Sequence, residues 1–333
     1  MIKLLLAALC LCALPARAQT EAAPATDEAP AAASEQILVT GQKPGPGLWK
    51  VSKGEHVLWV FGTYAPLPKK MEWRSREVDA ILSQSQEYIE QPSVTLDVSY
   101  WRIATLIPKM FGLKKNPDGR QLRELMPADV YARWLVLKEK YIGKDDDIEG
   151  ERPIFAAGTL FDKALKQSGL VNDGDVAKAI EASVTRNKLK RTSLLIKVPI
   201  KDPKRMVKSY KAGTLDDLAC FTKTLDRLET DLEAMRVRAN AWAVGDLAVI
   251  EKLSYPDREG ACSAAMTQAA FMQDEPGLVE AKPRARAAWL GAVEKALATN
   301  KSSFAVLKVS ELLDPKGLLS VLQARGYAVE KPE

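Results

Sequence analysis

One stretch, residues 48–91, constrains the fold more than any other part of the chain. It reads LWKVSKGEHVLWVFGTYAPLPKKMEWRSREVDAILSQSQEYIEQ. Residues 57–61 form a nearly continuous apolar run, which is typical of a strand buried on both faces. The whole pattern predicts strand, tight turn, strand, loop, a helix from Ser75, and a second short strand at residues 88–90.

This order of elements also predicts where a site would lie. In a parallel α/β sheet, ligands bind at the carboxyl ends of the strands. The loop at residues 63–68 follows the first long strand, and Glu90 ends the next. We therefore expect the loop and the Glu90 carboxylate to meet at one edge of the sheet.

The remaining chain alternates helical and strand patterns. Apolar residues at helical spacing predict helices at 126–141, 153–170, 176–187, 214–243, 277–299 and 316–325, after an apolar and aromatic helical stretch at 100–111. Short β-prone runs predict strands at 193–198, 303–309 and 326–329. The helix at 214–243 is expected to be the longest.

The N-terminus has the features of an export signal. Lys3 precedes an apolar stretch that is too short to span a bilayer, and Ala16-Arg17-Ala18 follows. We expect cleavage after Ala18 and a periplasmic or secreted protein. Removing Lys3 and Arg17 lowers the net charge from +5 to +3, which is too slight to indicate binding to nucleic acid or anionic lipid. No later apolar run is long enough for a transmembrane segment.

Residues 19–46 are rich in Ala, Pro, Glu and Thr, which predicts a disordered linker. Within it, a short β-prone segment begins at Ile37 and ends at Gln42. It resembles the TonB box of outer-membrane receptors, which binds by adding a strand to a sheet edge. An accidental apolar patch, or an edge strand docking on the body, is the favoured interpretation, because six residues carry little specificity.

Two cysteines, Cys220 and Cys262, remain after cleavage. In an oxidising compartment such a pair usually forms a disulfide. A reactive thiol or a metal pair is the less favoured alternative, because no histidine lies near either in the sequence to activate it.

The pattern LWKV…FGTxxxLP…W…IE resembles the opening of the TraB/PrgY/GumN family (TraB/GumN), which includes the Tiki-type membrane proteases. The resemblance covers residues 48–330, and the region 220–262 is similar to the exported GumN-type branch. It implies an α/β (α+β) fold of the EreA/ChaN-like kind, with a central mixed β-sheet, many surrounding helices and a helical hairpin insertion. We expect a single domain over 47–333, with a helical subregion at about 203–275 stapled over one face of the sheet by the disulfide.

The family's residues can be placed one by one on this chain. Its first Gly-Thr-x-His signature falls on Gly62 and Thr63, but the histidine position is Ala65, and alanine can neither ligate a metal nor move a proton. The glutamate of the next strand is kept as Glu90. The family also carries an Arg-Asn pair before a tryptophan, and this pair falls on Ala285 and Arg286 when Trp289 anchors the alignment.

The second Gly-x-x-His motif of the family falls on residues 308–311. Its glycine has become Lys308 and its histidine has become Glu311. Both histidine motifs are therefore degenerate, whereas residues that carry the scaffold are kept.

The inventory of side chains limits the chemistry further. The chain has one histidine, His56, which lies in a predicted hairpin turn at the opposite end of its strand from the expected site. We expect it to be exposed to solvent, so a Ser-His-Asp or Cys-His arrangement is close to excluded. Glu90, Glu311 and Asp314 could still hold a divalent cation. The favoured role of these carboxylates is structural, as ion-paired or hydrogen-bonded groups, because Lys308 beside Glu90 and Glu311 would satisfy them.

Two functions remain open. The favoured hypothesis is a catalytically inactive member of the family that uses no cofactor and binds a peptide or protein through the former active-site cleft. The alternative is a metal-dependent peptidase with a site rebuilt from Glu90 and Glu311. The sequence names no particular substrate or partner.

Overall fold

The computed structural model describes residues 46–71, 73, 75–172, 174–252 and 258–332. Residues 43–333 form one compact unit. The predicted signal peptide at 1–18, its cleavage after Ala18, nearly all of the linker at 19–46 and the segment from Ile37 to Gln42 lie outside the described residues.

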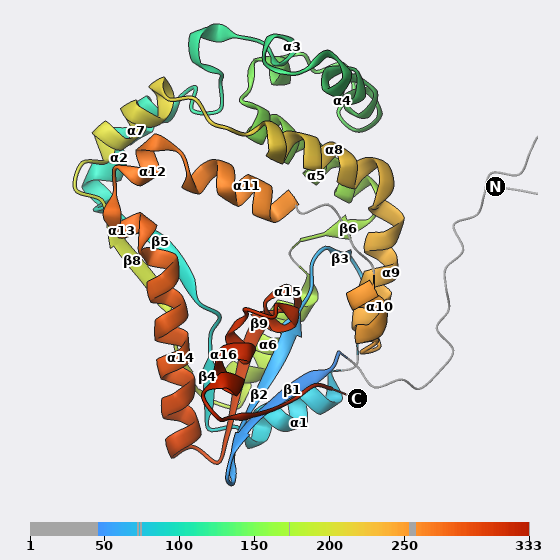
Figure 1. The fold of residues 1–333 in the computed structure, drawn as a ribbon, viewed down its shortest axis with the longest axis vertical. Helices are drawn as coiled ribbons and strands as arrows, with labels where there is room; N and C mark the ends of the chain where they lie inside the picture. The colour runs from blue at the N-terminus through green and yellow to red at the C-terminus, as the bar shows by residue number, and fades with distance from the viewer. Residues whose placement is uncertain (1–45, 72, 74, 173, 253–257, 333) are drawn as a thin grey trace, which may run out of the picture. The chain divides into compact units, whose positions relative to one another are not determined.

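Six strands form a central mixed sheet in the order β10-β1-β2-β9-β4-β7 (Figure 1). β2, β9, β4 and β7 run parallel, and β1 lies antiparallel between β2 and β10. The mixed sheet that the sequence predicted is therefore confirmed. The strands are β1 (Leu48–Lys53), β2 (His56–Thr63), β4 (Glu87–Ile89), β7 (Lys190–Thr192), β9 (Ser302–Lys308) and β10 (Ala328–Glu330).

Both faces of this sheet are covered, as the apolar run in β2 predicted. Along β9, Phe304 and Val306 pack into one core and Ala305 and Leu307 into the other, because successive side chains of a strand point to opposite faces. The core of Phe304 includes α1 (Arg76–Gln84), α6 (Asp175–Arg186), α9 (Leu232–Ala243) and α10 (Leu247–Lys252). The core of Ala305 includes α14 (Ala281–Thr299), α15 (Val309–Leu313) and α16 (Leu318–Ala324).

A third core is made mostly by helical residues, together with Leu170. The stripe predicted on the helix at 126–141 is confirmed, since Val130, Trp134, Leu137 and Tyr141 are all buried. Trp134 lies 5.2 Å from Phe221, measured between ring centroids. The helices of this core are α3 (Leu122–Leu125), α4 (Ala128–Tyr141), α5 (Pro153–Gln167), α8 (Leu218–Thr230) and the start of α9.

The other elements lie outside the central sheet. Two small sheets pair β3 (Leu67–Pro68) with β6 (Leu170–Val171) and β5 (Ser93–Asp97) with β8 (Leu195–Pro199). Two short 3-10 turns cover Pro117–Gly119 and Asp147–Gly150. The remaining helices are α2 (Tyr100–Met110), α7 (Pro203–Ala212), α11 (Arg258–Thr267), α12 (Ala270–Gln273) and α13 (Pro276–Val279).

The predicted helix at 214–243 is in fact two helices, α8 and α9, which meet at Asp231. The buried Asp231 carboxylate accepts hydrogen bonds from Arg238, and the Nε of Arg227 lies 3.5 Å from it. Burial raises the pKa of Asp231, although both arginines act to lower it. The longest described helix is instead α14, with 19 residues.

The strand predicted at 193–198 is present but lies outside the central sheet. It forms as β8, but it pairs in parallel with β5, which the sequence analysis did not predict. The edge of the central sheet is occupied by β7, whose three residues are too few to give a pattern in the sequence.

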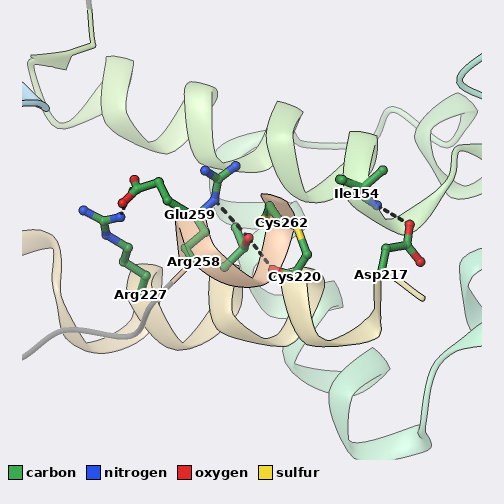
Figure 2. The surroundings of a disulfide bond; sticks show 8 residues. Ile154, Asp217, Cys220, Arg227, Arg258, Glu259 and Cys262 are labelled. Atoms are coloured by element: carbon green, nitrogen blue, oxygen red, sulfur yellow. Dashed lines mark hydrogen bonds and ion pairs between the residues drawn. A yellow bond between two sulfur atoms is a disulfide. The ribbon is translucent and has the colours of Figure 1, made fainter. Parts of the chain in front are cut away.

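Cys220 and Cys262 form the predicted disulfide, which joins α8 to α11 across 42 residues of chain, with the two Cα atoms 4.5 Å apart (Figure 2). The prediction that the stapled helices cover the sheet holds only for the middle of the region. α8 packs in the helical core, and the contact with the sheet is made by α9, where Trp242 Nε1 donates a hydrogen bond to the Gly62 carbonyl at 2.6 Å.

Replacing both cysteines with serine should lower the free energy of unfolding by about 4 kcal/mol, because the open chain regains the entropy of a 42-residue loop. Urea unfolding of the variant and the oxidised protein measures the difference. Reducing the wild-type disulfide is the matched control and should give a similar loss. A change below about 1 kcal/mol in both would contradict this expectation.

Candidate functional site

The predicted meeting point at the carboxyl ends of the strands is present. Thr63, the last residue of β2, is the register partner of Lys308, the last residue of β9. Glu90 follows β4, which pairs with β9 on its other side. Thr63, Ala65, Glu90 and Lys308 all line one cavity of about 1160 Å³. Four of the eight family positions therefore converge on a single opening.

Gly62 and Thr63 have clear structural roles. A Cβ atom at Gly62 would lie 2.8 Å from Val309 Cγ2 and 2.9 Å from Trp49 Cζ3, so only glycine lets these side chains pack against the strand. The Thr63 hydroxyl donates a hydrogen bond to the Leu307 carbonyl at 3.2 Å. The fold alone explains why both residues are kept.

Arg286 and Glu311, two of the altered family positions, contact each other. Arg286 Nη1 lies 2.5 Å from Glu311 Oε1, and Glu311 also accepts a hydrogen bond from the Leu318 amide at 3.0 Å. Ala285, the position before Arg286, is buried in α14. Neither Glu311 nor Arg286 lines the cavity at the strand ends. The Glu311 carboxylate thus binds Arg286 of α14 and the first backbone amide of α16.

A structural, ion-paired role is present for Glu311, but its partner is Arg286, and Lys308 pairs with neither Glu311 nor Glu90. No described residue lies within ion-pair distance of the Lys308 ammonium or the Glu90 carboxylate, because Arg286 takes the place of Lys308 beside Glu311. Asp314 does line the cavity, but its carboxylate accepts a hydrogen bond from the Lys316 amide. Glu90 and Lys308 therefore offer opposite charges inside the cavity.

Residues from the disulfide-linked helices form another wall of the cavity. Arg227, Arg258 and Glu259 line it, and Arg227 Nη1 lies 2.9 Å from Glu259 Oε1 (Figure 2). The Arg258 guanidinium lies 4.2 Å from the centre of the Phe161 ring and donates from Nε to Thr224. Burial lowers the pKa of Arg258. These residues could not be predicted from the sequence, because nothing local in α8 or α11 connects them to the strand ends.

Tyr88 of β4 and Glu181 of α6 are two further polar residues in the cavity lining. The Tyr88 hydroxyl donates to Glu181 Oε1 at 3.3 Å, and Arg191 Nη1 pairs with Glu181 Oε2 at 2.6 Å. Burial and the Glu181 charge raise the pKa of Tyr88, so its phenol stays protonated and acts as a donor. The Glu181 carboxylate on the cavity wall is therefore already bound by Tyr88 and Arg191.

His56 begins β2 and lies at the other end of this strand from Thr63, as predicted. It is half-buried rather than exposed, and its Nδ1 donates a hydrogen bond to the Asn300 carbonyl at 2.7 Å. At the same end, Asn300 and Lys190 contact the Glu87 carboxylate. Burial acts to raise the pKa of Glu87, but hydrogen bonds from Thr192, Asn300 and Lys190 outweigh it and hold this pKa below its usual value.

The resemblance implies a metal for some members of the family, so the fit of such an ion can be judged from the side chains. Among the described residues, no group of three or more His, Cys, Asp or Glu side chains is placed to hold one. Ala65 has no donor atom, and Glu311 is paired with Arg286. The described residues do not fit a metal centre at this place.

No helix in the described part of the chain is long and apolar enough to cross a membrane.

A family model described as the TraB/PrgY/gumN family matches residues 47–331. The chain therefore belongs to this family, as the sequence motifs indicated. Comparisons with curated proteins and with solved structures gave no significant match.

The Arg286–Glu311 pair should contribute about 1 kcal/mol to stability, because both side chains are largely shielded from water and lie in direct contact. A double-mutant cycle with Arg286→Met and Glu311→Gln, followed by urea unfolding, measures the coupling energy. As a control, the more exposed Arg325–Glu294 pair should give a smaller value. Strict additivity at Arg286 and Glu311 would contradict a direct interaction.

Proposed function

We propose that this protein is an exported, catalytically inactive member of the TraB/PrgY/gumN family that binds a peptide or protein partner. Its binding site is the cavity at the carboxyl ends of β2, β4 and β9. This function requires no metal or other cofactor.

The observation that carries the proposal is the Arg286–Glu311 ion pair. The resemblance implies asparagine and histidine at these two positions, and here both have changed to residues that contact each other. An Arg–Glu pair connects α14 to α15 and stabilises the scaffold, whereas a lone histidine there would be free to act on a ligand. With Ala65 in the place of the other histidine, neither motif supplies an imidazole.

The binding role is supported by what the cavity retains. At about 1160 Å³ it exceeds the usual size of a small-molecule pocket. Its lining carries Glu90 and Lys308, which have no ion-pair partner among the described residues, alongside apolar side chains such as Val306 and Leu313. A lining with opposite charges and apolar side chains suits a peptide that carries charges of both signs.

Export is supported by two independent features. The N-terminus has the basic, apolar and Ala-x-Ala regions of a signal peptide. Cys220 and Cys262 are bonded, and disulfides of this kind persist in oxidising compartments such as the periplasm.

The purified protein should cleave no member of a random peptide library, with or without added Zn²⁺, Mn²⁺ or Co²⁺, because both histidine positions lack an imidazole and the Glu311 carboxylate is paired with Arg286. Mass spectrometry of the library before and after incubation detects cleavage. Stoichiometric bound metal together with chelator-sensitive cleavage that is lost in Glu311→Ala would sink the inactive assignment. It would favour a rebuilt peptidase site instead.

Peptide binding should depend on the charges of Glu90 and Lys308 in the cavity lining. On an arrayed library of random decapeptides, Lys308→Glu should weaken the strongest binders at least tenfold and shift the preference away from acidic peptides. Glu90→Lys should shift the preference away from basic ones. Lys295→Glu, an exposed change on α14 outside the cavity lining, is the matched control. Binding that is unaffected by either cavity substitution would place the partner elsewhere.

A further inference from the structure

Helix α2 exposes an unusual concentration of large apolar side chains. Tyr100, Trp101 and Phe111, just past its end, are 77%, 79% and 76% exposed. Ile103, Ile107 and Met110 are also exposed, and we call these six residues the α2 patch. Single exposed apolar residues are ordinary, but six within twelve residues of chain mark an interaction surface.

The orientation of α2 explains the patch. Among its eleven residues, all of them described, only Leu106 is buried. At 100° per residue, the polar side chains of Arg102, Thr105 and Lys109 occupy one narrow strip, and apolar side chains fill most of the remaining circumference. The helix therefore rests on the protein along the line of Leu106 and turns its apolar arc outward.

The segments that contain α2 and α7 are rich in cations. Residues 100–115 contain four Lys and Arg side chains and no acid, and residues 197–211 contain six with one acid, Asp202. The two segments lie together, because Arg102 donates to the Lys201 carbonyl at 2.9 Å and Lys211 donates to the Phe111 carbonyl at 2.6 Å (Figure 1).

None of these ten cations forms an ion pair with a described residue. On α7, Lys204, Arg205 and Lys208 are exposed on the face opposite to the buried Pro203 and Tyr210. The Asp202 side chain accepts a hydrogen bond from the Arg205 amide, so it caps α7 and does not pair with a cation. The surroundings of the α2 patch thus carry a strong local positive charge.

We propose that the α2 patch docks on the surface of an anionic lipid bilayer. Aromatic side chains would enter the interface between headgroups and acyl chains, and the cations of α7 and of the chain after α2 would lie over the headgroups. An eleven-residue helix is too short to span a bilayer, so α2 would lie in the plane of its surface. This inference does not rest on the proposed peptide cavity, whose lining contains no residue of α2.

The charge pattern favours a bilayer over a second copy of this chain. In a symmetric dimer each α2 patch would face the same patch of its partner, and ten cations from each copy would be brought together. An acidic protein would satisfy the charge, but it would also need a surface complementary in shape to the exposed helix. A lipid interface accepts such a surface without requiring shape complementarity.

The test is co-sedimentation of the full-length chain with two kinds of sucrose-loaded vesicle. One is phosphatidylcholine alone, and the other is phosphatidylcholine with about 30% phosphatidylglycerol, which makes its surface anionic. We expect binding at least tenfold tighter to the anionic vesicles, and loss of that preference in about 0.5 M NaCl, where screening is strong. The double variant Trp101→Ser/Phe111→Ser should bind at least tenfold more weakly. Lys204→Glu/Lys208→Glu should lose the preference for anionic lipid.

The matched control is Leu135→Ser/Val136→Ser, which removes exposed apolar side chains from α4 and should leave binding unchanged. Every variant carries the same residues 1–45, so differences report on the substituted surface alone. Equal melting temperatures would establish that the exposed substitutions leave the fold intact. Unchanged binding of the Trp101→Ser/Phe111→Ser variant would overturn the proposal. The proposal would also be overturned if the wild type formed a dimer in light scattering and did not bind vesicles, while the Trp101→Ser/Phe111→Ser variant was monomeric.

Discussion

The parallel pairing of β2 with β9 is the constraint on which the site depends. It brings together two segments separated by more than two hundred residues and sets Thr63 directly beside Lys308. The register leaves no room for error, because a slip of one residue would turn every buried side chain of β9 to the wrong core. Gly62 adds to this precision, since Val309 and Trp49 pack where any Cβ would stand. The two family motifs are therefore held at one sheet edge by packing that does not involve their chemistry.

This separation of scaffold from chemistry accounts for the pattern of kept and altered residues. Gly62 and Thr63 have roles in packing and in hydrogen bonding to the backbone, so the fold itself requires them. Arg286 and Glu311 have become a pair that connects α14 with α15. The cavity remains, with the charges of Glu90 and Lys308 inside it. The function proposed above rests on this combination of a retained cavity and missing histidines.

Charge on this protein is informative locally and misleading as a sum. The small net charge of the chain gave no reason to expect an anionic partner. The fold nevertheless gathers unpaired cations of α7 beside the exposed aromatic side chains of α2, through hydrogen bonds from Arg102 and Lys211. Screening confines electrostatic attraction to about a Debye length, so a local cluster acts on a surface independently of charges on the far side.

The sequence by itself determined the elements whose pattern is local. The apolar run of β2, the helical stripe from Val130 to Tyr141 and the pairing of Cys220 with Cys262 could all be predicted, as could the convergence of the 63–68 loop with Glu90. Only the tertiary structure decided that β8 pairs with β5, that Glu311 binds Arg286 and not Lys308, and that Arg227 and Arg258 line the cavity. The physical reason is that short strands and ion pairs take partners from distant parts of the chain. Several partners look equivalent along the sequence, and burial and distance in the folded protein select among them.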